Sequence, residues 1–212
     1  MEPTLTGRPI DPDRLTMAAI SDGALRDRLV SVLGFARSGI ALARFLVDAG
    51  ARVTVYDGRP VSELADAVEA LEQRDVRLLL GPDMDPADAW RDADLVTSSP
   101  SINPDFPTTE PRLRAALGEL IRRRTSGDSS VPAVIWEADL FLRLCPSPTI
   151  GISGTKGKTT TSALAHAVLS ADTAHRAVLG GNMGRPIVER LPELGPEDRV
   201  VFELSELQLP TL

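Results

Sequence analysis

The sequence predicts an α/β protein with parallel sheets, and three observations support this class. Short apolar runs, such as Leu29–Leu33, alternate along the chain with segments whose apolar residues recur at helical spacing. Glycine-rich turns connect two of these runs to the helix that follows. Strands that alternate with helices are joined by crossover connections, and such connections place the strands parallel to one another.

The first half of the chain predicts one domain of this kind. Its expected strands are apolar and rich in β-branched residues, and they cover residues 29–33, 51–56, 76–80 and 94–97. Its expected helices cover residues 38–49, 61–74 and 112–124. Strand, glycine turn, helix and strand form a βαβ unit at the start, so we expect a Rossmann-like domain over residues 29–124.

The segments outside this domain predict a leader, a linker and a second domain. Residues 1–28 carry three prolines and many charges, and they predict a loose leader with one short helix near residues 17–26. The polar segment 125–130 is the expected linker to an α/β domain over residues 131–212. That domain is expected to hold strands at 131–135, 148–152, 177–179 and 199–204 and helices at 137–144 and 159–170.

Composition excludes several classes of protein. The 212 residues carry a net charge of −7, which argues against general binding to the phosphate backbone of nucleic acids. Cys145 is the one cysteine, so neither an internal disulfide nor a cysteine-based metal cluster is expected. The N-terminal residues lack an apolar signal-peptide core, and no apolar run reaches the length of a membrane helix. We therefore expect a soluble, cytoplasmic and monomeric protein with no nucleic-acid partner and no membrane insertion.

A glycine-rich loop with phosphate-binding character lies between a predicted strand and a predicted helix in the second domain. It reads Gly154-Thr-Lys-Gly-Lys-Thr-Thr160. Glycines let successive backbone N–H groups point at one phosphate, and a helix N-terminus adds partial positive charge. Lys158 is placed to reach the β- and γ-phosphates of a nucleotide, and the hydroxyl of Thr159 to ligate Mg²⁺. Both lysines of the chain, Lys156 and Lys158, lie here, whereas its other basic residues are arginines.

A second glycine turn, Gly34-Phe-Ala-Arg-Ser-Gly39, follows the first predicted strand and opens a helix. It is similar to the G-x-G-x-x-G pattern, with Ala36 in place of the middle glycine. Asp57 ends the second strand, where a dinucleotide-binding fold places its ribose-binding acid. These residues alone predict an NAD or FAD site, but the missing glycine hinders close approach of a pyrophosphate. A diphosphate of another kind, or a tight turn without a ligand, fits the turn as well.

Two further residues have a functional and a structural interpretation. Glu203 ends an apolar strand 45 residues after Lys158, and in phosphate-loop enzymes an acid on a neighbouring strand holds Mg²⁺. A solvent-facing carboxylate at a strand edge is the structural alternative. Asn182 lies in a glycine-rich loop, where it is most simply a turn asparagine.

Seven segments, in this order along the chain, resemble the Mur ligase family. They are residues 32–39, 53–57, 98–102, 137–141, 151–161, 181–184 and 203–209. The G-T-x-G-K-T-T loop is shared across that family. The E-L-S-x-x-Q-L segment and the short Rossmann-like first domain resemble its D-glutamate-adding branch.

The resemblance implies a role for each motif. The first domain would bind the UDP part of a substrate through Arg37, Ser38, Asp57, Gly58, Arg59 and Ser101, and Asn182 would contact the UDP-sugar. ATP would be held by Gly154, Thr155, Lys156, Gly157, Lys158, Thr159 and Thr160, with Lys158 as the catalytic cation. Thr159 and Glu203 would bind Mg²⁺.

The reaction that the resemblance implies is ATP-dependent amide formation in peptidoglycan synthesis. The terminal carboxylate of UDP-N-acetylmuramoyl-L-alanine would be activated as an acyl phosphate, and the amine of D-glutamate would attack it. The products would be the amide, ADP and phosphate. Because the family continues into the rest of its central domain and a third domain, the second domain here is expected to be a truncated P-loop α/β domain. The isolated chain is accordingly expected to be inactive.

Three departures from the family pattern are the residues Lys156, Ser101 and Glu206, which stand where the family often has asparagine, glycine and serine. Two functions of other classes also stay open. An NAD(P)-dependent oxidoreductase would use Gly34, Gly39 and Asp57, although it leaves the phosphate loop unexplained. A free-standing UDP-sugar-binding module would use the first domain alone. A sister ligase that adds another amino acid is a nearer alternative.

Overall fold

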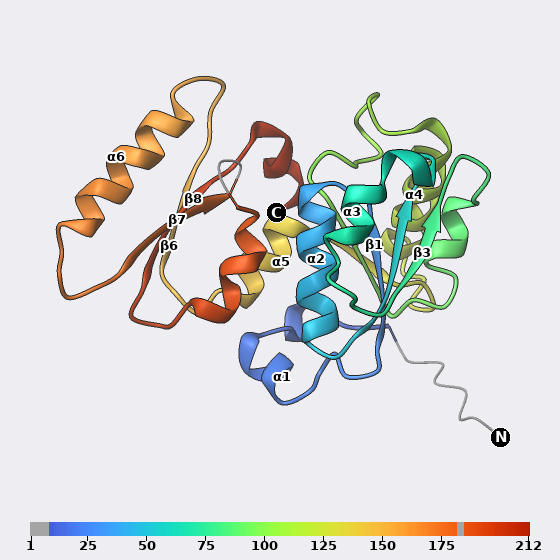
Figure 1. Ribbon diagram of the computed structural model, residues 1–212, viewed down its shortest axis with the longest axis horizontal. Coiled ribbons are helices and arrows are strands. Elements are labelled where there is room, and N and C mark those ends of the chain that lie inside the picture. The colour runs from blue at the N-terminus through green and yellow to red at the C-terminus, as the bar shows by residue number, and fades with distance from the viewer. Residues whose placement is uncertain (1–8, 182–184) are drawn as a thin grey trace. The chain divides into compact units, whose positions relative to one another are not determined.

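The computed structural model describes residues 9–181 and 185–212 (Figure 1). The chain divides into a first unit that ends at Ile135 and a second unit, Trp136–Leu212. A five-stranded sheet forms the centre of the first unit, and a three-stranded sheet forms the centre of the second. Among the described residues, no helix combines the length and the apolar character that crossing a membrane requires.

The first sheet has a doubly wound, Rossmann-like strand order, β3-β2-β1-β4-β5. Its strands are β1 (Leu29–Leu33), β2 (Arg52–Asp57), β3 (Val76–Leu80), β4 (Leu95–Ser98) and β5 (Ala133–Trp136). β1 pairs in parallel with both β2 and β4, and β2 pairs in parallel with β3. The predicted fold class, a parallel α/β domain of the Rossmann type, is therefore confirmed for this unit.

Helices cover this sheet because their apolar residues fall on one side. The helices of the unit are α1 (Met17–Ser21), α2 (Arg37–Asp48), α3 (Ala65–Glu69), α4 (Pro111–Thr125) and the short 3₁₀ helices η1 (Pro12–Arg14), η2 (Val61–Glu63) and η3 (Pro86–Ala89). In α2, Leu42, Phe45 and Leu46 are buried, and the helix packs on β1 and β2 (Figure 1). The helix ends beside Gly50, whose φ of +89° favours glycine.

Helix α4 completes the core on its own side of the sheet. Leu113, Leu117 and Leu120 recur at spacings of four and three residues, so they share one face and pack in a cluster with Tyr56 and Trp90. The carboxylate of Glu110 accepts the N–H groups of Arg112 (3.0 Å) and Leu113 (2.6 Å), which caps the first turn. The C-terminal end of α4 carries three arginines, which is favourable beside the negative end of the helix dipole.

Two segments of the first unit differ from the sequence prediction. The described part of the leader is packed rather than loose, because Leu15 and Leu25 are buried and Ile10 donates its N–H to the carbonyl of Asp94 at 2.8 Å. The prediction of one continuous helix over residues 61–74 is wrong, because the last helical residue there is Glu69. The segment breaks into η2 and α3, and Glu72 and Gln73 then adopt positive φ values of 52° and 61°, which a continuing α-helix does not allow.

The second unit has three parallel strands in the order β6-β8-β7. Its elements are β6 (Thr149–Ile152), β7 (Ala177–Gly181), β8 (Arg199–Glu203), the helices α5 (Glu137–Leu144) and α6 (Lys158–Ser170) and the 3₁₀ helices η4 (Ile187–Glu193) and η5 (Glu206–Thr211). The rings of Phe141 in α5 and Phe202 in β8 meet edge to face at 5.0 Å. Helix α6 packs on β7 and β8, and it exposes Leu164 and Val168 to solvent.

The expected domain limits, 29–124 and 131–212, stay a prediction, but the strand after the linker has a clear place. β5 lies beside β4 in the first sheet, so residues 133–135 belong to the first unit.

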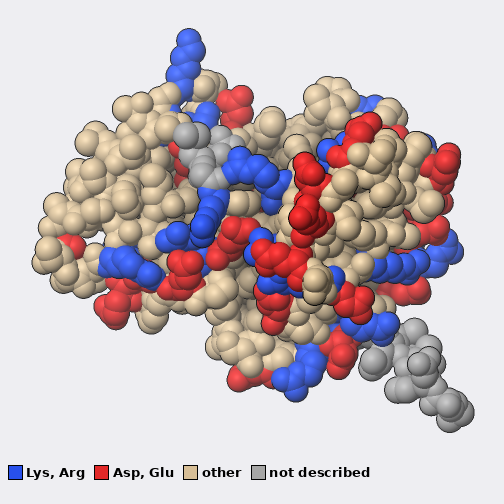
Figure 2. All heavy atoms as spheres, in the orientation of Figure 1, with Lys and Arg blue, Asp and Glu red and all other residues tan. Residues whose placement is uncertain are grey.

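Figure 2 shows acidic and basic side chains interspersed over most of the face that it draws, whereas the surface over α6 is almost free of charge.

Candidate functional site

The strand order of the first unit places a crevice where three of the predicted binding segments begin. β1 has β2 on one side and β4 on the other, and in open parallel sheets ligands bind outside the carboxyl ends of the strands at this switch point. Gly34 follows β1, Ser99 follows β4, and Asp57 is the last residue of β2. The sheet therefore brings segments from residues 34, 57 and 99 to one edge.

The glycine turn after β1 is held by close backbone contacts. Gly34 has a φ of +87° and donates its N–H to the carbonyl of Tyr56 at 2.8 Å. A Cβ atom on Gly39 would lie 1.8 Å from the carbonyl oxygen of Gly34, so only glycine fits at the start of α2. Arg37 and Ser38 are the first two residues of α2, and among the described residues no side chain caps this helix. Its first N–H groups are thus placed to meet a ligand.

Asp57 links the glycine turn to the loop after β2. Its Oδ2 atom accepts the N–H of Phe35 at 2.8 Å and the Nη2 of Arg59 at 2.8 Å. Its Oδ1 atom accepts the backbone N–H and the Nε of Arg59 at 2.9 and 3.0 Å. Burial alone would raise the pKa of the Asp57 carboxyl, but the hydrogen bonds from Arg59 and Phe35 lower it below its usual range. Asp57 is therefore an ionised group that fastens two loops.

A cavity of about 210 Å³ opens beside these loops. It is lined by Gly34, Tyr56, Asp57, Gly58, Ser101, Ile102, Thr108, Thr109, Glu110 and Leu113. Three of the residues predicted to bind UDP line it, namely Asp57, Gly58 and Ser101. Ser101 is held by its neighbour, since the Oγ atoms of Ser99 and Ser101 lie 3.1 Å apart. Arg37, Ser38 and Arg59 lie outside its lining, at the start of α2 and against Asp57.

The sequence analysis missed Tyr56 and Glu110, which also line this cavity. Burial raises the pKa of the Tyr56 phenol, and the nearby carboxylate of Glu110 raises it further, so this hydroxyl stays protonated at neutral pH. The Glu-Pro pair at residues 110–111 is a recognisable helix start. That signal marks the helix but not the cavity, because residues 56 and 110 meet only through the fold.

The phosphate-type loop of the second unit joins β6 to α6. Gly154 and Gly157 have positive φ values of 146° and 79°, and a Cβ atom on Gly157 would meet no atom within 4 Å. The Nζ of Lys158 donates to the carbonyl of Gly154 at 2.5 Å, so the ammonium group lies across the loop. Thr155, Lys156 and Thr160 are exposed around it. The Oγ of Ser153 is buried and has no hydrogen-bond partner among the described residues, which leaves one donor available inside the loop.

Glu203 reaches this loop from the neighbouring strand. β8 pairs with β6 so that Glu203 stands opposite Ile152, the residue that begins the loop. The carboxylate of Glu203 accepts the hydroxyl of Thr159 at 3.4 Å, and Glu203 is only 2% exposed. A hydroxyl and a carboxylate are oxygen ligands of the kind that Mg²⁺ prefers. Among the described residues no three His, Cys, Asp or Glu side chains gather around a metal position, so Mg²⁺ here would need phosphate oxygens as well.

The remaining predicted site residue is Asn182, which lies outside the described residues. Of the two other departures from the family pattern, Lys156 is exposed in the loop and Glu206 is exposed at the start of η5.

Comparison with known proteins identifies relatives of one kind. No family model matches the chain. The chain is 31% identical over 188 residues to the UDP-N-acetylmuramoylalanine–D-glutamate ligase of Ruminiclostridium cellulolyticum, and the match covers 89% of this chain and 37% of the ligase. It is 38% identical over 186 residues to the ligase of the same name from Trichlorobacter lovleyi, covering 87% and 37%. For the Geobacter metallireducens ligase the identity is 39% over 180 residues, covering 85% and 36%.

Solved structures add only weak likenesses. The 3-oxoacyl-(acyl-carrier-protein) reductase of Agrobacterium tumefaciens, with NADP bound, aligns with a TM-score of 0.37 at 17% identity, covering 88% of this chain and 96% of that one. A short-chain dehydrogenase/reductase of Serratia marcescens aligns with a TM-score of 0.33 at 13% identity, covering 85% and 97%. The fold assignment rests on the strand order β3-β2-β1-β4-β5 of the first unit.

The sequence relatives, in contrast, agree with one another in name and in the part of their length that is matched. The chain spans somewhat more than a third of the length of the curated ligases that it matches. The resemblance that the motifs predicted is confirmed to this extent: the curated relatives that the chain matches over most of its own length are named UDP-N-acetylmuramoylalanine–D-glutamate ligase.

Proposed function

We propose that this chain supplies the nucleotide-binding and UDP-substrate-binding parts of an ATP-dependent ligase that joins D-glutamate to UDP-N-acetylmuramoyl-L-alanine in peptidoglycan synthesis. The observation that carries the proposal is the pairing of Thr159 with Glu203 at the phosphate-type loop, with their oxygens 3.4 Å apart. A hydroxyl at a helix N-terminus beside an acid on the neighbouring strand suits a nucleotide with its Mg²⁺ ion. The names of the relatives supply the reaction.

In the second unit, each loop residue has a task in this proposal. Gly154, Thr155, Lys156, Gly157 and Thr160 wrap the phosphates of ATP, Lys158 neutralises their charge, and Thr159 and Glu203 hold Mg²⁺. ATP would supply the phosphoryl group that activates the substrate carboxylate as an acyl phosphate. The chain's own contribution is charge neutralisation and alignment, because the loop and the N-terminus of α6 present fixed positive groups.

In the first unit, the glycine turn and the 210 Å³ cavity form the proposed UDP site. The uncapped N-terminus of α2, with Arg37 and Ser38 in its first turn, suits a diphosphate. The cavity lined by Gly58, Ser101 and Tyr56 lies beside it and suits the nucleoside. Arg59 keeps the loop closed through Asp57, and Asn182 is proposed to contact the sugar.

The engagement of Asp57 counts against the oxidoreductase alternative. A dinucleotide site uses this acid to accept the ribose hydroxyl. Here both carboxylate oxygens already accept two N–H groups each, from Phe35 and Arg59. A ribose would have to displace charge-assisted hydrogen bonds, which are stronger than neutral ones. We therefore favour a site in which Asp57 supports the loop.

The proposal is tested by nucleotide binding with matched variants. The chain should bind ATP in the presence of Mg²⁺, and Glu203→Gln should remove most of the Mg²⁺ dependence. Glu197→Gln is the control, because it removes an equal charge just before the other end of β8 from an exposed position. Isothermal titration calorimetry with and without Mg²⁺ measures both. Equal loss in the two variants, or binding of ATP that ignores Mg²⁺ in the parent chain, would contradict the proposal.

A second assay separates a complete ligase from a contributing part. Since the chain spans about 37% of its relatives' length, we propose that it does not complete the reaction alone. ATP, Mg²⁺, UDP-N-acetylmuramoyl-L-alanine and D-glutamate should yield no phosphate release above background. Release that depends on D-glutamate would overturn this part of the proposal. Binding of the UDP-sugar without any ATP binding would instead favour the free-standing binding module.

A further inference from the structure

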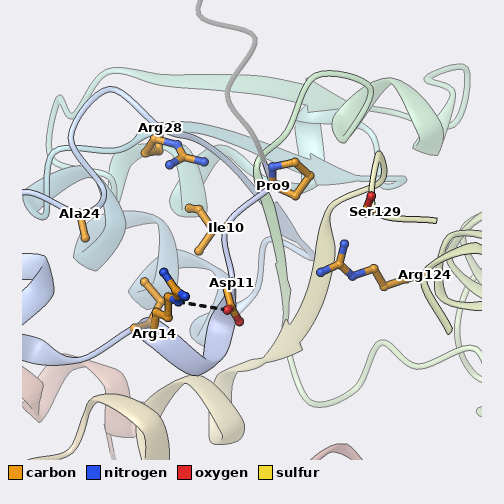
Figure 3. A pocket seen from close by; sticks show the side chains of 9 residues that line it. Pro9, Ile10, Asp11, Arg14, Ala24, Arg28, Arg124 and Ser129 are labelled. Atoms are coloured by element: carbon orange, nitrogen blue, oxygen red, sulfur yellow. Dashed lines mark ion pairs between the residues drawn. The ribbon is translucent and has the colours of Figure 1, made fainter. Parts of the chain in front are cut away.

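The first unit has a second cavity, of about 540 Å³, on the sheet edge opposite the glycine turn. Arg28 directly precedes β1, whereas the glycine turn follows β1, so the two cavities open at opposite ends of the strand. The lining residues are Pro9, Ile10, Asp11, Arg14, Leu15, Ala24, Arg28, Arg124 and Ser129 (Figure 3). We call this cavity the arginine pocket. Nothing in the proposed ligase reaction uses it.

Three arginines from separate parts of the chain line the arginine pocket. Arg28 is anchored from behind, because its Nε donates to the buried carboxylate of Asp94 at 2.8 Å. Arg14, on η1, is exposed and lies 3.5 Å from the carboxylate of Asp11. Figure 3 shows Arg28 and Arg124 reaching toward the space beside Ile10 from different sides.

Arg124 is the arginine whose charge is not neutralised. Its side chain is half-buried at the C-terminal end of α4, and its Nη1 donates to the carbonyl of Val131 at 3.3 Å. Within residues 9–181 and 185–212, no carboxylate lies within ion-pair distance of it. The pocket therefore holds three guanidinium groups against the carboxylates of Asp11 and Asp94, which leaves an excess of positive charge. A half-buried cation of this kind favours an anionic ligand.

The rest of the lining is mixed, since Asp11 and Ser129 are polar and the other residues are apolar. Ile10 and Leu15 are buried, and Pro9 and Ala24 add further carbon surface. A volume of about 540 Å³ lies within the range of small-molecule sites, which combine apolar walls with a few polar groups. Inorganic phosphate alone would leave these walls uncovered. The ligand should therefore carry an apolar group beside its charge.

We propose that the arginine pocket binds a small phosphomonoester that carries an apolar group. The doubly charged phosphate would accept hydrogen bonds from the guanidinium groups of Arg124 and Arg14, whose planar donor pairs match phosphate oxygens. The apolar group would lie against Ile10 and Leu15. The site is independent of the proposed UDP and ATP sites, since it shares no residue with either of them.

Phenyl phosphate is the probe, and residue-resolved NMR of the full 212-residue chain is the measurement. Titration should shift the amide signals of Arg14, Ala24 and Ser129, and these shifts should saturate together. Phenyl phosphate should bind more tightly than inorganic phosphate, because only the former covers the apolar wall. Signals from residues 154–160 or 34–39 report any separate binding at the other two sites.

Matched variants test which arginine side chains bind the phosphate. Arg124→Gln should weaken binding about tenfold, as expected for the loss of one charge-assisted hydrogen bond. Arg14→Gln should weaken it about threefold, because this side chain is exposed. Arg122→Gln is the control: it lies on the same helix, removes the same charge, and its exposed side chain pairs with Glu119. It should leave the affinity unchanged.

Three results would overturn the proposal. Shifts confined to residues 154–160 and 34–39 would place the phosphate elsewhere. Equal weakening by Arg122→Gln and Arg124→Gln would show general charge attraction only. Equal affinities for phenyl phosphate and inorganic phosphate would remove the role of the apolar wall. Because Arg14→Gln and Arg122→Gln change exposed side chains, both should fold, and the comparison remains valid even if Arg124→Gln is unstable.

Discussion

Replacement of Gly39 by alanine tests the geometry of the glycine turn, because two physical effects predict opposite results. Gly39 lies in the first turn of α2, and helix propensity alone predicts that Gly39→Ala stabilises the protein by up to about 1 kcal/mol. The structure instead places the new Cβ atom 1.8 Å from the carbonyl oxygen and 2.8 Å from the carbonyl carbon of Gly34. Real Cβ contacts essentially never fall below 3.0 Å, so the helix would have to move by more than about 1 Å.

The balance of these effects gives a net loss. Overpacking of this size costs about 3 kcal/mol, and more where both partners are backbone that cannot rotate away. We expect Gly39→Ala to lower the free energy of unfolding of the first unit by about 2 kcal/mol or more after the propensity gain. The control is Gly118→Ala in the middle of α4, where the new Cβ meets only Arg122 and Pro104 at 3.5 and 3.6 Å. That variant should be neutral or more stable by up to about 1 kcal/mol.

Urea unfolding followed by Trp90 fluorescence measures both variants. Trp90 is buried in the first unit, and the chain's other tryptophan, Trp136, is replaced by phenylalanine in every variant so that the signal reports one unit. A Gly39→Ala protein as stable as its parent would refute the close approach of α2 to the glycine turn. A Gly118→Ala protein that loses as much as Gly39→Ala would show that glycine is required in these helices for some other reason.

Two further predictions concern the hydrogen bonds of Asp57 and the core of the second unit. The lowered pKa of Asp57 means that its ionised form stabilises the fold, an effect fully present above the unfolded pKa of about 3.8 and lost as the pH falls through the folded value. The difference in urea-unfolding free energy between the parent and Asp57→Asn should therefore be largest near pH 7 and should shrink below about pH 4; a difference independent of pH would contradict the ionised pairing with Arg59. In the second unit, Phe141→Ala should cost about 3–5 kcal/mol, because the ring is fully buried against Phe202. Hydrogen exchange of the β8 amides measures this loss, and the half-exposed neighbour Leu142→Ala should change it little.

The sequence predicted the strands and the longer helices well because local patterns determine them. β1, β3 and α5 have the expected bounds, since each is a mainly apolar segment with a glycine or proline just beyond its end. The segment 61–74 was harder, because alanine, leucine and glutamate favour a helix locally while the left-handed turn at Glu72 and Gln73 is set by packing. The packed leader was missed for a related reason: Ile10 and Leu25 are isolated apolar residues whose burial depends on the sheet.

The candidate sites likewise contain features that local sequence patterns predict and features that only the fold brings together. The phosphate-type loop could be predicted, because strand, glycines, lysine and helix are contiguous in the sequence. Glu203 could be placed near it only once the order of the parallel strands was known. The cavity of the first unit combines Tyr56 with Thr108–Glu110, segments about fifty residues apart, and no sequence period joins them. The four hydrogen bonds of Asp57 likewise required the positions of Phe35 and Arg59 in the fold.

The identity of the nucleotide that the first unit binds decides between a UDP-sugar site and a dinucleotide site. Titration of the isotope-labelled chain with UDP-N-acetylmuramoyl-L-alanine, and separately with NADH, can be followed through the amide signals of Gly34, Phe35 and Gly58. We expect the UDP-sugar to shift these signals, UDP to compete with it, and NADH to leave them unchanged. Saturable binding of NADH at these amides, with no effect of the UDP-sugar, would contradict a UDP site in the first unit.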